Sequence, residues 1–303
     1  MSILKFIPKN KKSFKSAWKT DNISAGSSND NQVKLPLELS GVYNMIVDWG
    51  DGSKNIITAW NQLETTHTYA SIGTYIINIY GTCKGFRFNN TGDRLKITDI
   101  KTWGNKFNLG NNNGYFYGCN NLLINAINIL NQTITTMENM FRDCINFNQS
   151  VSNFNTVNAT SMYAAFNGCT NFNQSVSNFN TVNVITMQAM FLGCTNFNQL
   201  ISNFNTANVT NMSFMFNGCT NFNQSVSNFN IEKVTTLVNM LNGATSWSTS
   251  NYDTALISWA AQNVKDGVTF RCSTKYSLGG AAEAARTHLT TVHSWAITDL
   301  GGI

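Results

Sequence analysis

Seven cysteines are the side chains of this sequence best suited to chemistry, because thiols ligate metals, pair as disulfides and act as nucleophiles. Five of them recur at a step of 25 residues, at Cys119, Cys144, Cys169, Cys194 and Cys219. The other two, Cys83 and Cys272, lie outside this series. An odd count argues against a complete disulfide framework. No Cys-x-x-Cys pair and no nearby histidine completes a zinc site. We therefore expect buried structural thiols, no metal and no cofactor.

Acidic and histidine side chains offer the next chemistry. Asp48 and Asp51 flank a glycine in a turn and are candidate calcium ligands, although no further run of acidic ligands follows them. Aspartate also caps turns through its own backbone, and we favour that role. His67 has no nucleophile or ligand cluster beside it, which favours a hydrogen-bonded histidine at a strand edge.

Catalysis by carboxylates is not expected. Hydrolysis of a glycan needs paired carboxylates in a cleft. From Cys144 to Ile231 the sequence contains no Asp, Glu, Lys, Arg or His, and Asp253 and Glu283 have no partners that we can identify. We therefore predict that the protein is not an enzyme and has no catalytic residues.

Repeats of 25 residues must position these side chains. Methionines and two sets of phenylalanines keep the step of the cysteines, at Met137, Met162, Met187 and Met212, at Phe141, Phe166, Phe191 and Phe216, and at Phe147, Phe172, Phe197 and Phe222. Such self-similarity is typical of a solenoid, in which each unit buries its apolar face against its neighbours. In one unit the apolar residues Met212, Met215, Phe216 and Cys219 have the helical spacing i, i+3, i+4 and i+7. A segment of strand length, Phe222–Ser227, follows them. We therefore predict a short helix, a short parallel strand and two turns in each coil.

Three stretches resemble known families. The repeat MFLGCTNFNQLISNFNTANVTNM, from Met190 to Met212, resembles the BspA-like leucine-rich-repeat surface proteins of bacteria and protists. The segments VDWGDGS and HTYASIGTYIINIYG, within residues 47–81, are similar to the polycystic-kidney-disease-type (PKD-like) immunoglobulin fold. NYDTALISWAAQ and WAITDLGG resemble the closing segments of repeat proteins from Bacteroidetes-like bacteria and their phages. These resemblances imply a surface-displayed adhesion protein without catalytic activity, carrying a small β-sandwich as a spacer or binding module.

The expected fold class is therefore mixed α/β and β-rich, with a leucine-rich-repeat-like right-handed solenoid preceded by a small immunoglobulin-like β-sandwich. We expect a basic N-terminal arm and linker at 1–30, the PKD-like sandwich at 31–82, a bridge and N-terminal cap at 83–115, the solenoid at 116–250 and a C-terminal α/β cap at 251–303. Within the last region, helices are expected at 252–260 and 280–291, and strands at 267–271 and 295–298.

The N-terminal arm is strongly basic. Six lysines and no acidic residue lie in the first twenty residues, at Lys5, Lys9, Lys11, Lys12, Lys15 and Lys19. They form either a solvated arm or an anchor that docks on an acidic partner, such as a virion protein. Nucleic-acid binding is not expected, because the arm lacks a fold motif. No secretory signal and no membrane-spanning run is visible, so we expect a chain that stays in the cytosol or leaves it by another route.

The repeats present neutral Asn, Ser and Thr side chains in place of charged ones, which suits carbohydrate hydroxyls. The candidate ligand-facing residues, which can also merely solvate a sheet, are Asn148, Ser150, Ser152, Asn173, Ser175, Ser177, Asn198, Asn223, Ser225 and Ser227. We predict a non-catalytic recognition protein for a host-surface glycan or protein, displayed on a bacteriophage virion as a host-binding or decoration protein. The alternatives are a BspA-like adhesin on a bacterial surface or secreted, and a purely structural virion protein. A homo-oligomer is left open.

Overall fold

The computed structural model describes residues 13–128, 130 and 134–303, and the chain divides into two compact units at residues 133 and 134. The N-terminal unit contains nine strands and one 3₁₀ turn within its described residues. They are β1 (Phe14–Lys19), β2 (Gln32–Lys34), β3 (Leu37–Asp48), β4 (Lys54–Ile57), the turn η2 (Leu63–Thr65), β5 (Thr66–Thr68), β6 (Thr74–Phe86), β7 (Ile97–Trp103), β8 (Phe107–Asn108) and β9 (Leu123–Ile124).

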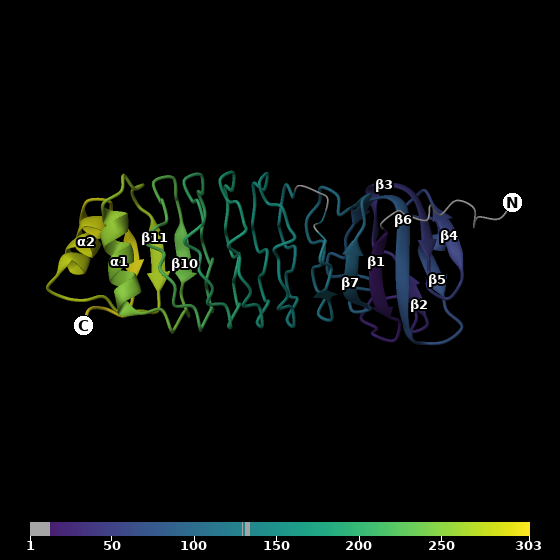
Figure 1. Cartoon of the computed structure of the whole chain (residues 1–303). Coiled ribbons are helices and arrows are strands. Elements are labelled where there is room, and N and C mark those ends of the chain that lie inside the picture. The colour runs from purple at the N-terminus through teal and green to yellow at the C-terminus, as the bar shows by residue number, and fades with distance from the viewer. Residues whose placement is uncertain (1–12, 129, 131–133) are drawn as a thin grey trace. The chain divides into compact units, whose positions relative to one another are not determined.

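One seven-stranded sheet dominates this unit, in the order β4-β3-β6-β1-β7-β9, with β8 pairing on β6 (Figure 1). The pairs from β4 to β7 are antiparallel, whereas β7 with β9 and β6 with β8 are parallel. A separate antiparallel pair joins β2 to β5. The predicted immunoglobulin-like sandwich is therefore wrong, because one large mixed sheet takes the place of two comparable ones. The predicted bridge at 83–115 contains the end of β6 and the strands β7 and β8, which all belong to this sheet.

The described part of the predicted N-terminal arm contributes a strand, β1, to the inside of the sheet. β1 lies between β6 and β7, with Phe14 opposite Ile79 on one side and Trp103 on the other. Phe14 and Trp18 are buried, and the ring of Phe14 stacks on that of Phe107 at 3.8 Å. Burial of these aromatic side chains outweighs the basic character of the segment.

The predicted anchor lysines are split by this arrangement. Lys15 is a half-buried residue of β1, and Lys19, at its exposed end, pairs with Asp21 at 2.7 Å. Lys5, Lys9, Lys11 and Lys12 lie outside the described residues. An anchoring role for the lysines stays a prediction.

The C-terminal unit is a stack of 25-residue coils whose main-chain hydrogen bonds alternate in direction. The N–H groups of Met212, Phe214 and Phe216 donate to carbonyls of the next coil, at 2.8–3.2 Å. The N–H groups of Met215 and Cys219 instead donate three residues back, within their own coil. An α-helix would need every such N–H to donate four residues back. The segment is therefore a ribbon of turns that uses half of its donors to bind the neighbouring coil.

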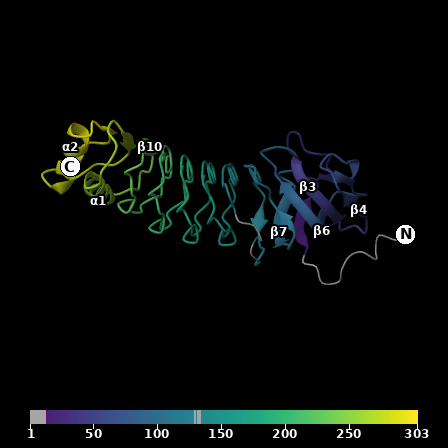
Figure 2. The same ribbon diagram turned by 90° about the horizontal axis from the view of Figure 1, so that it is seen from above.

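This hydrogen bonding overturns the predicted fold class. The described protein is β-rich, as expected, but the coils from 136 to 235 contain neither the helices nor the strands of a leucine-rich-repeat-like solenoid. Single parallel bridges link them, at Thr136–Ser161, Ser161–Thr186, Thr186–Asn211 and Asn211–Thr236. The segment Phe222–Ser227, expected as a strand, has no regular secondary structure. Figure 2 shows the successive coils lying face to face without helices between them.

The interior of the stack follows the sequence pattern. Phe141, Phe166, Phe191 and Phe216 are buried and stack on one another at 5.5–5.7 Å between ring centroids. The buried thiol of Cys194 donates to the carbonyl of Phe166 at 2.9 Å, and Cys169 and Cys219 make the equivalent bond. Each coil therefore buries its aromatic and sulfur groups only against its neighbours.

The last coil and the residues after it form regular elements. They are β10 (Leu237–Leu241), α1 (Thr249–Ala260), β11 (Thr269–Cys272), α2 (Ala281–Thr291) and β12 (Ala296–Thr298), and the three strands form a parallel sheet. Ser248 caps α1 by accepting from the N–H of Asn251. These elements lie close to the helices and strands expected at 252–260, 267–271, 280–291 and 295–298. No helix in the described part of the chain is both long and apolar enough to cross a membrane.

Candidate functional site

The predicted ligand-facing residues lie on the surface of the coils. Asn148, Ser150, Ser152, Ser175, Ser177, Asn198, Asn223 and Ser225 are exposed, and Asn173 and Ser227 are half-buried. Their places agree with a solvent-facing role, but the hydrogen bonds of the four asparagines show that these four also hold the coils together.

The four asparagines form a ladder, which we call the asparagine ladder (Asn148, Asn173, Asn198 and Asn223). The side-chain oxygen of each residue accepts the main-chain N–H of the next one at 2.9 Å, and that of Asn223 accepts from Ser248 at 3.0 Å. Each oxygen also accepts a second donor from the next coil, at Gln174, Gln199, Gln224 and Asn251. These amide oxygens are therefore engaged by the fold, and ligand binding through the ladder stays a prediction.

The serines make local turns. Ser175 and Ser177 share a hydrogen bond between hydroxyls at 2.9 Å, and the N–H of Ser177 donates back to the Ser175 oxygen at 3.3 Å. The pairs Ser150–Ser152 and Ser225–Ser227 repeat this arrangement. In the coil between them Leu200 takes the first serine position and is 68% exposed. The serine row is therefore interrupted, and the surface is not a uniform array of hydroxyls.

A comparison of the coils with one another identifies a different strip. All four coils keep Asn-Phe-Asn-Gln at 146–149, 171–174, 196–199 and 221–224, where the asparagine ladder needs it. The position of Tyr163 instead holds five different residues in five coils. The positions one and four residues later also vary, and we call these three positions of each coil the variable edge. Its residues are Glu138, Asn139 and Arg142; Tyr163, Ala164 and Asn167; Gln188, Ala189 and Leu192; Ser213, Phe214 and Asn217; Val238, Asn239 and Asn242.

The main chain arranges the variable edge as one continuous strip. The N–H of Asn139 donates to the carbonyl of Tyr163, that of Ala164 to Gln188 and that of Phe214 to Val238, at 2.8–2.9 Å. Neighbouring coils are therefore about one strand spacing apart along the edge, roughly 4.8 Å. Most of its side chains are half-buried, so they lie along the surface with one side accessible.

The backbone of the variable edge is strained. Ala164, Ala189 and Phe214 have φ angles of 50°, 54° and 60°, in the left-handed region. That conformation costs about 1–2 kcal/mol for a residue with a Cβ atom. Asn139 and Asn239 occupy the same position in other coils, and asparagine tolerates it better. Alanine and phenylalanine are thus retained where asparagine or glycine fits the backbone better, and such strain tends to gather at functional positions.

Charge on the variable edge is confined to one coil. Glu138 and Arg142 are its only ionisable side chains apart from Tyr163. The guanidinium of Arg142 lies 3.9 Å from the carboxylate of Asp143, and both side chains are partly exposed, so this pair contributes little. Beyond that coil the strip consists of amides, a phenol, a hydroxyl and apolar groups.

The aspartates of the turn between β3 and β4 cap that turn. Asp48 accepts from the N–H of Gly50 and pairs with Lys54 at 2.7 Å. Asp51 accepts from Ser53 and from the ring of His67, which lies in β5 and stacks on Trp49. Burial acts to raise the pKa of Asp51, but hydrogen bonds from Ser53 and His67 outweigh it and lower that pKa to about 2. Among the described residues no cluster of three acidic, histidine or cysteine side chains is placed to hold a metal.

The two acidic residues singled out after the repeats have separate partners. Asp253 accepts from the N–H and the hydroxyl of Ser277, at 2.9 and 2.6 Å. Glu283 accepts from the N–H of Gly279 at 2.8 Å, ahead of α2. Asp253 therefore ties α1 to the segment after β11, and Glu283 stabilises the local turn ahead of α2.

Sequence reasoning chose the recurring polar residues and missed the variable edge. The signal was present in the sequence, as the contrast between an invariant segment and a position with five different residues. Its meaning needed the structure, because only the hydrogen bonds show that the invariant asparagines serve the fold.

Comparison with known proteins gives one match. The model of a family described as Mycoplasma protein of unknown function, DUF285, matches residues 111–200 and again residues 160–276. No curated protein and no solved structure matches the chain.

Proposed function

The chain belongs to the DUF285 family, whose model covers more than half of it, and from the surface of its repeats we propose that it is a non-catalytic recognition protein. The variable edge binds a protein partner, while the invariant asparagines keep the coils in register. The single observation that carries this proposal is the variation among otherwise matching coils, which is greatest at one position of this continuous strip.

The chemistry of the variable edge supports a protein partner. Tyr163 and Phe214 offer aromatic anchors, and Gln188 and Asn217 offer neutral donors and acceptors. Binding surfaces built from aromatic residues with Ser and Asn around them recognise proteins by adaptable hydrogen bonds and rigid rings. Glycans fit less well, because the asparagine oxygens that favoured them are engaged between coils.

The place of display is part of the proposal. The resemblance of the closing segments supports a virion-attached protein of a bacteriophage, either host-binding or decorating. The description of the family names Mycoplasma, a bacterial genus, and supports a second candidate, an adhesin on the bacterial surface. Immunogold labelling with an antibody against this protein separates the two, since it marks either released particles or cell envelopes.

The binding test uses the labelled full chain and intact Mycoplasma cells. Phe214→Asn keeps a side chain that tolerates the left-handed backbone, and with Tyr163→Ala it removes both aromatic anchors. We expect the double variant to bind at least about tenfold more weakly. Leu200→Ala, an exposed apolar change outside the variable edge, is the matched control and keeps wild-type affinity. Trypsin treatment of the cells abolishes binding if the receptor is a protein.

Equal affinity of the double variant and the wild-type protein contradicts recognition through the variable edge. Binding that survives trypsin but not glycosidase treatment assigns the edge to a glycan instead. A chain that begins at Ser13 tests the anchor, because a longer deletion removes β1 from the centre of the sheet.

A further inference from the structure

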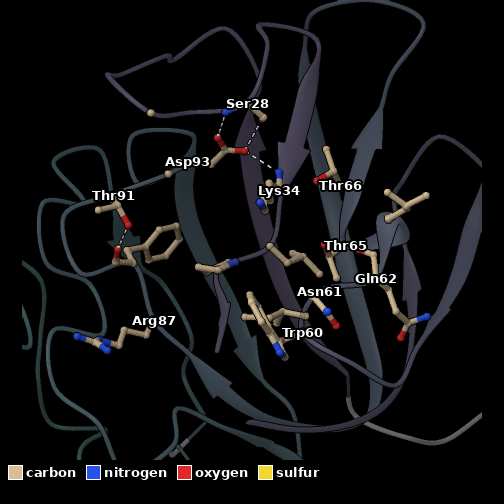
Figure 3. Close-up of a pocket in the computed structure, with 17 residues that line it drawn as sticks. Ser28, Lys34, Trp60, Asn61, Gln62, Thr65, Thr66, Arg87, Thr91 and Asp93 are labelled. Atoms are coloured by element: carbon tan, nitrogen blue, oxygen red, sulfur yellow. Dashed lines mark hydrogen bonds between the residues drawn. The ribbon is translucent and has the colours of Figure 1, made fainter. Parts of the chain in front are cut away.

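The N-terminal unit contains a cavity of about 560 Å³ between the η2 loop, the segment that joins β2 to β3, and the residues after β6 (Figure 3). This volume falls in the usual range for small-molecule sites. All of its lining residues belong to the N-terminal unit, so it is separate from the variable edge.

An exposed aromatic side chain lines the cavity. Trp60 is 40% exposed and Leu63 is 91% exposed, whereas Leu35 and Phe88 are each only 2% exposed. An indole in this setting presents an apolar face to a ligand and an N–H to water. The apolar face of a pyranose ring packs well on such a surface.

The only carboxylate that lines the cavity is already engaged. Asp93 is buried and accepts from the N–H and hydroxyl of Ser28, both at 2.7 Å, and from the N–H of Lys34 at 2.6 Å, as the dashed lines of Figure 3 show. The ammonium of Lys96 lies 3.7 Å from the same carboxylate. Asp93 therefore has little capacity left to accept hydrogen bonds from a ligand, and its negative charge is compensated by Lys96.

One cationic side chain that lines the cavity, Lys34, has unused capacity. Lys34 is exposed, and no carboxylate in the described part of the chain pairs with its ammonium. Arg87 also lines the cavity, but its guanidinium donates to Asn113 at 3.2 Å and lies 3.9 Å from Glu38, and Figure 3 shows it directed away from Trp60 and Lys34. The positive charge available to a ligand in the cavity is therefore that of Lys34.

We propose that this cavity binds an acidic monosaccharide unit, a hexuronate or a sialate, with its ring on Trp60 and its carboxylate on Lys34. Aromatic surface and positive charge occur together here, and the carboxylate that could repel an acidic ligand is compensated. The inference goes beyond the proposed function, because it concerns the other unit and a small acidic ligand.

Calorimetry on the full chain with D-glucuronate and N-acetylneuraminate tests the proposal, with D-glucose as the neutral comparison. We expect saturable binding of at least one acidic sugar, weaker binding at higher salt, and affinity for glucose at least about tenfold lower. Two single variants test the contacts, Lys34→Gln and Trp60→Ala, and each is expected to weaken binding about tenfold. Lys34→Gln keeps the main-chain N–H that donates to Asp93.

Lys106→Gln, an exposed lysine outside the cavity, is the matched control and keeps wild-type affinity. Unchanged thermal melting of every variant shows that the fold is intact. The proposal is overturned if neither acidic sugar binds, if glucose binds equally well, or if Trp60→Ala has no effect. Tighter binding of a tri-aspartate peptide than of both sugars also overturns it. Each of these results leaves cell binding through the variable edge untouched.

Discussion

The side-chain oxygen of Asn173 lies 2.9 Å from the main-chain nitrogen of Asn198, in the next coil, and 2.9 Å from the side-chain nitrogen of Gln199. One half-buried amide oxygen thus accepts two donors from the next coil. A main-chain N–H that has no partner in its own coil is satisfied in this way.

Asn173→Ala is expected to destabilise the protein by about 1–2 kcal/mol, because it removes one acceptor from two donors. Urea unfolding, followed by circular dichroism, measures the change in the free energy of unfolding. Asn171→Ala is the control, since its side-chain oxygen accepts only a long, exposed bond of 3.5 Å from Asn196. A loss equal to that of the control would show that water replaces the asparagine oxygen without cost.

Ala164→Gly is expected to stabilise the protein by about 0.5–1 kcal/mol, because glycine adopts the left-handed backbone at φ 50° without strain. Ala165→Gly, at the next residue, is the matched control. Both alanines are fully buried, but Ala165 is not left-handed, so the same change costs about 0.4–1 kcal/mol there. Thermal melting of the two variants gives the sign of each effect, and a loss of equal size at both sites would argue against strain at Ala164.

The unfolding free energy is expected to fall as the pH falls from about 4 to about 2, partly through Asp51. Although burial opposes it, hydrogen bonding lowers the pKa of this carboxyl to about 2 in the folded protein, below its ordinary value of 3.8. In that window the unfolded chain binds more protons, so protonation favours unfolding and the contribution of Asp51 is lost.

Asp51→Asn should therefore lose less stability than the wild-type protein between pH 5 and pH 2.5. Urea unfolding at the two pH values measures the difference. Glu64→Gln, which replaces an exposed carboxylate in η2, should keep the wild-type slope. If Asp51→Asn keeps that slope as well, other carboxyls carry the acid sensitivity.

The cysteines are expected to be inert in the native protein. All seven are buried and free of disulfides, and burial raises the pKa of the Cys83, Cys194 and Cys219 thiols. Thiolate is the reactive form, so little reaction with a thiol-specific reagent at pH 8 is expected within minutes. All seven should react in guanidinium chloride. Fast labelling of several thiols without denaturant would show that the coils open readily.

The sequence predicted the buried residues of the coils well. From residue 137 on, the phenylalanines, methionines and cysteines at the step of 25 residues are inside the stack, and the helices after the repeats lie close to their expected ranges. It did not predict β1, because the lysines around Phe14 and Trp18 pointed to a solvated arm. It also did not separate the asparagines that hold the coils from the residues that remain available to a partner.

The sequence by itself determined the period of the repeat and the side chains that face inward, because apolar spacing decides which residues are buried. The apolar positions Met212, Met215, Phe216 and Cys219 suit a helix and a ribbon of turns equally well. Only the tertiary structure decided between them, since the acceptors for Met212 and Phe216 lie in the next coil, at Thr236 and Met240. Where a main-chain donor finds its partner is a property of the stack, and no single repeat contains it.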